Sequence, residues 1–355
     1  MSEWRVTKVN QVAGVNAYYD GHWRIREESL HVPERAFFQV RSDESQANSK
    51  TRKKRKRQEQ MLAELITAGK FVPLDATVQD ALEAVHQKVK ADPELTELLP
   101  AFTDQKEAHE IDADEELRVV DKDADVNTTD KPQIVRSATS ENTIVLPPHS
   151  SFVKGDMRTL EWSTFGQFKL IVMDPPWENK SVGRRRNYAT FHHTELLKLD
   201  IPSISNPDEC VLGIWVTNRP AYSSFIVNEL LPTWGFRFHA TWYWLKICRN
   251  GDLVSPLQST HRLPVEKLLV AIRASSLERE ATLVTRLGST PKVVVSIPLR
   301  HSWKPPPESF FGDVGYESHD QKLELFAREL RPHWLSIGND VLHFQSTRLF
   351  QKTST

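Results

Sequence analysis

Cysteine is scarce in this sequence, which argues against a fold held together by disulfides. Among 355 residues there are two, Cys210 and Cys248, and both lie in apolar runs, "ECVLGIWV" and "WYWLKICR". Buried thiols in a reducing compartment explain this pattern better than a disulfide or a metal-binding pair. The sequence also lacks an apolar N-terminal segment of the signal-peptide type and any apolar run long enough to span a bilayer. We therefore expect a soluble intracellular protein with no membrane partner.

Net charge is almost absent as well, although charged residues are not. The formal net charge is -1 at pH 7, while 26% of the residues are charged and 39% are hydrophobic, which is enough for a packed core. Residues 51–58, "TRKKRKRQ", are strongly basic. This run is typical of a nuclear-localisation signal; a phosphate-contacting patch and an ordinary solvated charge run are the alternatives. We expect a nuclear protein, with the cytoplasm as a second location.

The first 148 residues differ in texture from the rest of the chain. Short aromatic and valine runs predict a few irregular strands in residues 1–40, and helical spacing predicts one or two amphipathic helices between 59 and about 100. Residues 104–132 are acidic and poor in aromatics, so we expect them to be exposed or disordered. We assign residues 1–148 to an N-terminal accessory region that helps to grip the substrate.

Residues 149–355 are assigned to an α/β domain of catalytic type. Helix-like stretches occur at 220–235 and 318–332, and the second opens with a capping-box pattern, Ser318 and Gln321. Near-continuous apolar strands that alternate with helices imply a sheet covered on both faces. The strand-like runs are "TIVLPP", "FKLIVMD", "CVLGIWV", "HATWYWLKI", "EKLLVAIR", "KVVVSIP" and "HWLSIGN".

The stretch "DPPW", residues 174–177, stands at the expected carboxyl end of "FKLIVM", where ligands bind in open α/β sheets. The residue before a proline is kept out of the helical region, and neither Pro175 nor Pro176 offers an N–H. What remains is a carboxylate and carbonyl oxygens, all acceptors, with the aromatic Trp177 beside them. That set suits a planar ring bearing an NH₂ group, such as adenine, whose amine could be held in line with an electrophile. The alternative is a tight turn that ends a strand.

Beyond these residues, the sequence resembles the eukaryotic adenine-N6 methyltransferases that use S-adenosylmethionine, of which "DPPW" is the signature. The resemblance is strong over residues 145–345 and loose in the N-terminal third, and one branch, that of methyltransferase-like protein four, is the most similar. It implies a Rossmann-like class I S-adenosylmethionine-dependent methyltransferase fold with permuted motif order, which fits the absence of a G-x-G-x-x-G motif. The stretches that carry it are "DPPWENKS", "WVTNR" (215–219), "HSWKPP" (301–306) and "ELFAREL…GN" (324–339).

The resemblance also implies the cofactor site, with S-adenosylhomocysteine as the product. Asp156 of "GDMR" matches a residue near the cofactor's adenine, and Lys304 matches the lysine that faces its methionine carboxylate. Phe326 and Arg328 match residues near the ribose and adenine, and Asp340 stands where some relatives carry an amide. The implied cofactor-binding residues are Asp156, Met157, Asp174, Lys304, Phe326, Arg328, Asn339 and Asp340, and the implied catalytic residues are Asp174, Pro175, Pro176 and Trp177.

For the acceptor base, Tyr188 and Glu266 match family positions that line the adenine pocket, and residues 178–181 match the loop after the motif. The basic "GRRR" at 183–186 suits a clamp on phosphates. Structural polar residues and a solvated loop are the alternatives for these positions. The implied substrate-binding residues are Glu178, Asn179, Lys180, Ser181, Arg184, Arg185, Arg186, Tyr188 and Glu266. The histidine spacings match no zinc pattern, and we expect no metal.

The predicted reaction is methyl transfer to the N6 amine of adenosine in RNA. For this branch, the resemblance points to 2′-O-methyladenosine in small nuclear RNA as the target. DNA adenine is the first alternative, and a catalytically silent, RNA-binding platform is the second. A protein amide fits less well, because such motifs usually carry Tyr or Phe where Trp177 stands. We expect a monomer without an obligate partner subunit.

Overall fold

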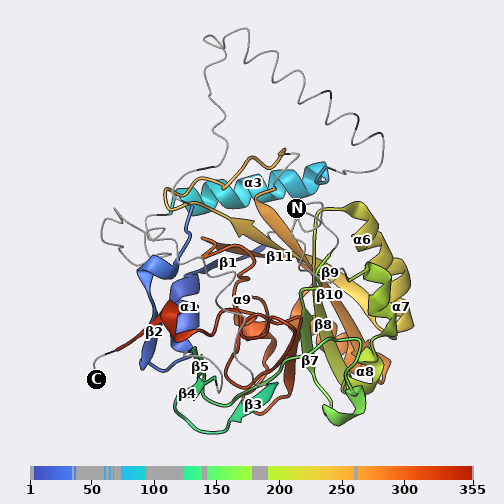
Figure 1. The fold of residues 1–355 in the computed structure, drawn as a ribbon. Coiled ribbons are helices and arrows are strands. Elements are labelled where there is room, and N and C mark those ends of the chain that lie inside the picture. Colours follow the sequence, from blue (N-terminus) through green and yellow to red (C-terminus); the bar gives the residue numbers. More distant parts are fainter. Residues whose placement is uncertain are drawn as a thin grey trace.

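The computed structural model describes residues 4–33, 36, 60, 64, 67, 73–92, 123–137, 142–177, 191–259 and 263–353 (Figure 1). The strands are β1 (Arg5–Val9), β2 (Trp23–Ile25), β3 (Ala124–Asn127), β4 (Gln133–Arg136), β5 (Thr143–Leu146), β6 (Ser150–Val153), β7 (Leu170–Met173), β8 (Glu209–Val216), β9 (Arg237–Lys246), β10 (Val265–Ala274), β11 (Lys292–Ser296), β12 (Lys322–Leu325), β13 (Leu335–Ile337) and β14 (Phe350–Lys352). The α-helices are α1 (Gln11–Ala17), α3 (Ala76–Lys90), α5 (Ile201–Ile204), α6 (Pro220–Phe225), α7 (Leu231–Thr233), α8 (Leu277–Leu287) and α9 (Glu308–Phe311). A π-helical turn, η7 (Ile226–Leu230), joins α6 to α7, and short 3₁₀ turns are η1 (Glu27–Ser29), η4 (Trp162–Thr164), η6 (His193–Lys198), η8 (Gly312–Val314) and η9 (Thr347–Leu349).

Within the described ranges, ten strands form one sheet in the order β1-β11-β9-β10-β8-β7-β12-β13-β6-β3. Strand β10 pairs antiparallel with both β8 and β9, and β3 pairs antiparallel with β6; the other pairings are parallel. Eight strands therefore run in one direction. This large, mostly parallel sheet with helices on its faces is consistent with the predicted Rossmann-like α/β fold.

Both faces of the sheet are covered, as the near-continuous apolar strands predicted. On β7, Ile171 and Met173 belong to the core that packs against α6, η7 and α7, whereas Leu170 and Val172 belong to the core under α8 and α9. Successive residues of a strand point to opposite faces, so both sets must be apolar when both faces are buried. Each of the seven predicted apolar runs overlaps one strand of the structure: β5, β7, β8, β9, β10, β11 and β13.

The predicted helix at 318–332 is wrong, because this stretch contains the parallel strand β12. The spacing of its apolar residues suggested a helix because Glu324, between Leu323 and Leu325, is charged and yet buried. The carboxylate of Glu324 is paired with the buried guanidinium of Arg331, so the inward charge is neutralised rather than solvated. The predicted helix at 220–235 is confirmed as the continuous α6, η7 and α7.

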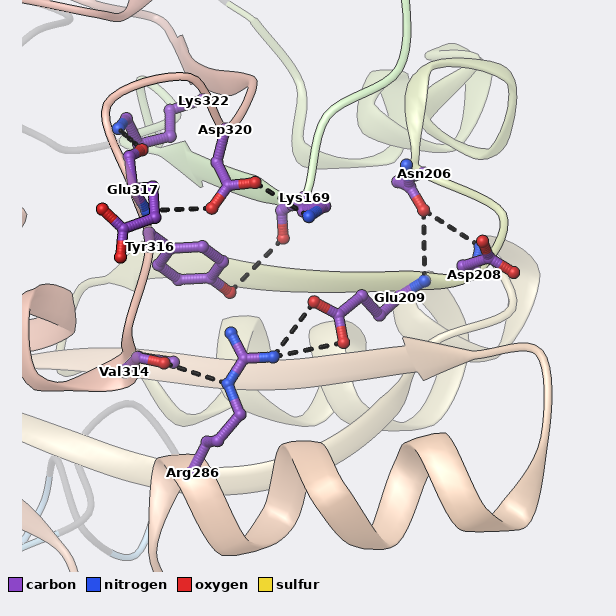
Figure 2. Close-up of polar contacts among 10 residues, drawn as sticks. All are labelled: Lys169, Asn206, Asp208, Glu209, Arg286, Val314, Tyr316, Glu317, Asp320 and Lys322. Atoms are coloured by element: carbon purple, nitrogen blue, oxygen red, sulfur yellow. Dashed lines mark hydrogen bonds and ion pairs between the residues drawn. The ribbon is translucent and has the colours of Figure 1, made fainter.

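The chain reaches β12 from β11 across the sheet, and a polar network holds this crossing at the amino ends of β7, β8 and β12 (Figure 2). Arg286 of α8 donates to both carboxylate oxygens of Glu209 and to the carbonyl of Val314. Asp320 accepts from Lys169 at 2.8 Å and from the backbone N–H of Glu317. These contacts lie at the amino ends of the strands, whereas ligands of open α/β sheets bind at the carboxyl ends. Figure 2 also shows the bond from the Tyr316 hydroxyl to the Lys169 carbonyl, the bond from Lys322 to the Glu317 carbonyl, and the bonds from the N–H groups of Asp208 and Glu209 to the side-chain oxygen of Asn206.

The described N-terminal residues pack into the same body as the strands after residue 149. β1 extends the sheet beyond β11, and β2 pairs with β14 near the C-terminus. α3 buries Leu82, Val85 and Val89 at helical spacing in a core shared with β9 and β11. The basic run 51–58 and the first part of the acidic stretch, 104–122, lie outside the described residues. The boundary after residue 148 stays a prediction.

Two further expectations concern cysteines and membranes. Cys210 and Cys248 are both buried, and neither forms a disulfide. Among the helices that the structure describes, none is long and apolar enough to cross a bilayer.

Candidate active site

The predicted site residues of the described chain gather at the carboxyl edge of the sheet. Because β6, β13, β12 and β7 run in one direction, the residues that follow them share one edge. Asp156 follows β6, Asn339 follows β13, Phe326 follows β12, and Asp174 follows β7. Strand β10 runs the opposite way, so its beginning, with Glu266, lies at this edge too. Segments far apart in the sequence thus converge on one place.

Four charged side chains from four elements form the centre of this edge. The ammonium of Lys304 lies 3.2 Å from a carboxylate oxygen of Asp174 and 2.6 Å from Oε2 of Glu266. The other oxygen of Glu266, Oε1, is bonded by the ammonium of Lys246, at the end of β9. We call Lys246, Glu266, Lys304 and Asp174 the charged quartet. Lys246 was missed by sequence reasoning, because a lysine that ends an apolar strand looks like an ordinary solvent contact.

The quartet is shielded from water, and its two lysines lie over tryptophan rings. The four side chains are 15–28% exposed. The ammonium of Lys304 is 5.3 Å from the ring centre of Trp215, and that of Lys246 is 4.3 Å from the ring centre of Trp244. Such surroundings strengthen ion pairs relative to exposed ones.

The pKa values follow from this arrangement. Burial alone raises the pKa of Glu266, but the ammonium groups of Lys246 and Lys304 outweigh burial and hold that pKa well below its ordinary value. Burial lowers the pKa of Lys304, but Asp174 and Glu266 outweigh it and raise that pKa above its ordinary value. Glu266 is therefore a carboxylate and Lys304 an ammonium throughout the neutral range.

The "DPPW" segment makes a tight turn with defined acceptors. The N–H of Trp177 donates to the carbonyl of Pro175 at 2.8 Å. No described residue donates to the carbonyl of Pro176, so this carbonyl and the Asp174 carboxylate are the acceptors that the turn presents. Trp177 is 7% exposed, its indole N–H donates to the carbonyl of Trp215, and its ring packs on Tyr222 at 4.7 Å. One face of the predicted stacking partner is thus already covered.

The loops that follow β12, β13 and β6 meet closely beside the quartet. A Cβ on Gly338 would lie 2.8 Å from the carbonyl oxygen of Ala327, so glycine is required for this approach. Gly338 also donates to the carbonyl of Val153 at 3.1 Å. Phe326 adopts a left-handed backbone with φ of 55°, a strained conformation for a phenylalanine, and such strain concentrates at ligand sites.

The other predicted cofactor residues differ in their exposure to solvent and in their partners. Asn339 is exposed and Asp340 and Arg328 are half-buried, whereas Met157 is buried in the core. The carboxylate of Asp156 is held by the guanidinium of its neighbour Arg158, with Nε bonds of 2.9 and 3.0 Å. This neighbour lowers the pKa of Asp156 by hydrogen bonding.

Among the described residues at this edge, Asn218 has a buried side-chain oxygen without a hydrogen-bond partner, and no role for it was predicted from the sequence. The side chain of Asn218, in "WVTNR" after β8, donates to the carbonyl of Val265 at 3.4 Å, and its own Oδ1 is buried without a hydrogen bond. A buried acceptor of this kind is costly unless a ligand satisfies it. Trp303, the tryptophan of "HSWKPP", is stacked on Phe344 in the core.

Several predicted substrate residues lie outside the described residues: Glu178, Asn179, Lys180, Ser181, Arg184, Arg185, Arg186 and Tyr188. In the part of the chain that the structure does describe, no group of three or more His, Cys, Asp or Glu residues is placed to hold a metal ion.

The mostly parallel sheet is consistent with a Rossmann-like α/β domain, whose candidate ligand site lies at the carboxyl ends of the strands. Residues 168–340 match the MT-A70 family. The N(6)-adenine-specific methyltransferase METTL4 of Mus musculus is 38% identical over 212 residues, which are 58% of this chain and 45% of that protein. These matches confirm the resemblance that the motifs predicted.

Two further relatives carry names that differ in the nucleic acid. The N6-methyladenosine RNA methyltransferase MTA1 of Pyricularia oryzae is 35% identical over 211 residues, 56% of this chain and 54% of that protein. The DNA N6-methyl methyltransferase of Caenorhabditis elegans is 34% identical over 228 residues, 63% of this chain and 60% of that protein. The chain therefore spans about half the length of the curated relatives it matches.

Proposed function

We propose that this protein transfers a methyl group from S-adenosylmethionine to the N6 amine of adenine in a nucleic acid. The observation that carries the proposal is the turn after β7, where the Asp174 carboxylate lies 3.2 Å from the ammonium of Lys304. Acceptors orient an amine, and a cation binds the carboxylate of a cofactor. The carboxyl ends of the strands provide both kinds of group.

The residues at this edge fit S-adenosylmethionine, which supplies an electrophilic methyl group on a positively charged sulfur. Lys304 is the cation for its carboxylate, and Asn339 and Asp340, at the end of β13, offer acceptors for ribose hydroxyls. Because Gly338 has no side chain, the end of β13 lies directly against the backbone of Phe326 and Ala327. Asp156 can accept from an adenine amine only by sharing its oxygens with Arg158.

The chain's own residues then orient the acceptor amine. Asp174 and the Pro176 carbonyl accept its two N–H bonds, which favours electron density on nitrogen and holds it in line with the methyl group. Trp177, fixed by its bond to Trp215 and packed on Tyr222, is largely buried and holds the turn that carries Asp174 in place. The proton leaves after transfer, so Asp174 need not act as a base beforehand.

RNA is the proposed substrate, with 2′-O-methyladenosine of small nuclear RNA as the target. The name of the Pyricularia oryzae relative supports RNA. DNA adenine is the second candidate, supported by the name of the Caenorhabditis elegans relative and its coverage of 60% of that protein. A base must leave its stack in either case, because N6 is inaccessible in a paired duplex. A silent RNA-binding platform is disfavoured, because all members of the charged quartet are present.

The remaining proposals concern fold type, location and assembly. We infer a class I methyltransferase sheet with permuted motif order, which the chain order supports: β7 and β8 precede the neighbouring β12 and β13. The basic residues 51–58 favour the nucleus. We propose a monomer, with residues 1–148 gripping the substrate.

Labelled-methyl transfer to matched oligonucleotides tests the function. The set contains one target adenine in RNA, in RNA with a 2′-O-methyl group, or in DNA, and a control RNA whose target purine lacks the 6-amino group. We expect transfer to be fastest with 2′-O-methyl RNA and absent from the control. Transfer to DNA alone would select the second candidate. No transfer to any member, with S-adenosylhomocysteine still bound, would favour the silent platform.

A further inference from the structure

Lys246 has no role in the proposed transfer, yet it is the outermost member of a continuous chain of ion pairs. Starting at Lys246, the chain runs through Glu266 and Lys304 to Asp174, and each inner member contacts both of its neighbours. Glu266 uses a different oxygen for each lysine, so the two ammonium groups do not compete for one atom. The register of β9 and β10, in which Val265 pairs with Leu245, brings Lys246 to the beginning of β10.

The charges of the quartet cancel, two carboxylates against two ammonium groups. Lys304 lies closer to Glu266, at 2.6 Å, than to Asp174, at 3.2 Å. If Lys246 were uncharged, Lys304 would be the one cation that the described residues place beside Glu266, and Lys304 would be drawn toward Glu266 and away from Asp174. Asp174 and an incoming carboxylate would then lose the cation that they need.

We propose that Lys246 is a positioning residue of the methyl-transfer site, which neutralises Glu266 so that Lys304 remains available to Asp174 and to the cofactor carboxylate. The inference rests on the proposed function. Lys246 is held for this task by the ring of Trp244, whose indole N–H is in turn bonded to Ser296 at 2.8 Å. The position of Lys246 therefore depends on a contact between β9 and the last residue of β11.

The proposal predicts a specific pH signature. Glu266 faces Lys246 from β9 and Lys304 from the loop after β11, and Asp174 faces Lys304 from the end of β7. In the wild-type protein Glu266 stays charged, so binding of S-adenosylhomocysteine should be flat between about pH 5 and about pH 8. Without Lys246, the burial of Glu266 raises its pKa, and protonation at the acid end releases Lys304. Binding should therefore strengthen as the pH falls.

The test compares Lys246→Met with Lys246→Arg and with a matched control, Lys267→Met. Lys267 is the next residue after Glu266 on β10 and points to the opposite face, so its loss removes the same charge without touching the quartet. Affinity for S-adenosylhomocysteine is measured by calorimetry across the pH range, and methyl transfer by single turnover. Melting temperatures of the three variants check folding.

For Lys246→Met we expect binding about tenfold weaker near pH 8 that recovers toward pH 5, and transfer roughly 10- to 100-fold slower. Lys246→Arg should restore both, and Lys267→Met should match the wild type. In a Glu266→Gln background, Lys246→Met should have no further effect.

Three results would overturn the inference: pH-independent binding by Lys246→Met, an equal loss in Lys267→Met, or additive losses with Glu266→Gln. If the wild-type protein binds S-adenosylhomocysteine but methylates no adenine, the proposed function is wrong. The affinity measurements across the pH range would still test the role of Lys246.

Discussion

The replacement of Gly338 by alanine tests whether the three loops at the carboxyl edge form one unit. The added Cβ would lie 2.8 Å from the Ala327 carbonyl oxygen, 3.0 Å from the Ala327 nitrogen and 3.2 Å from the Phe326 carbonyl carbon. All three contacts are with backbone, so no flexible side chain can move aside. Overpacking of this kind costs about 1–3 kcal/mol. For a chain of this size that corresponds to a fall in melting temperature of roughly 1–4 °C.

The second readout of Gly338→Ala is the stabilisation by S-adenosylhomocysteine. A ligand at one hundred times its dissociation constant stabilises by about 2.7 kcal/mol. If the loop of Phe326 shifts and affinity falls tenfold, about 1.4 kcal/mol of that stabilisation is lost. Gly312→Ala is the matched control, because nothing lies within 4 Å of its added Cβ and its φ is −62°. Differential scanning fluorimetry measures both quantities. If Gly338→Ala and Gly312→Ala have equal melting temperatures and equal increases in melting temperature with ligand, the reasoning is wrong.

Two other predictions concern more distant contacts. Gly14→Leu should weaken S-adenosylhomocysteine binding roughly tenfold, because a Cβ on Gly14 of α1 already lies 3.0 Å from Pro306, two residues after Lys304. The control is Ala13→Leu, an exposed position of the same helix, which should bind normally. Equal affinities of the two variants in a calorimetric titration would contradict the prediction. Asp320→Asn should cost about 1 kcal/mol of unfolding free energy at pH 7. Burial raises the pKa of Asp320, but hydrogen bonds from Lys169 and the Glu317 N–H outweigh burial and lower it. Its stabilisation is therefore present above the ordinary aspartate pKa and lost as the pH falls through the folded pKa. Urea unfolding of Asp320→Asn should show a flatter acid limb than the wild type; an unchanged limb would contradict this.

The strands of the sheet were predictable because both of its faces are buried. In β7 and β8 nearly every residue is apolar, and that pattern identified both as sheet-core strands. The helix α1 was not predicted, because its seven residues lie among the aromatic and valine runs that suggested strands. Strand β12 was mistaken for part of a helix, because its buried Glu324 is neutralised by Arg331, a contact that no local pattern reveals.

The location of the site was predictable from strand order, but its charge balance was not. Asp174 and Lys304 were expected at the site from their motifs, and Glu266 from its match to the family. Lys246 is twenty residues from Glu266 in the sequence, and their contact depends on the antiparallel register of β9 and β10. The hydrogen bond within the "DPPW" turn, from Trp177 to Pro175, likewise follows from backbone geometry. Because this bond occupies the Pro175 carbonyl, we propose the Pro176 carbonyl as the second acceptor, a distinction that the motif alone did not make.

Asp174→Ala, measured for both methyl transfer and S-adenosylhomocysteine binding, tests the central claim most directly. Asp174 is assigned to the amine, and Lys304 keeps its contact with Glu266 when Asp174 is removed. Transfer to the preferred oligonucleotide should therefore fall by at least about 100-fold, while binding stays within about threefold of the wild type. Equal loss of transfer and binding, or transfer at the wild-type rate, would contradict the account.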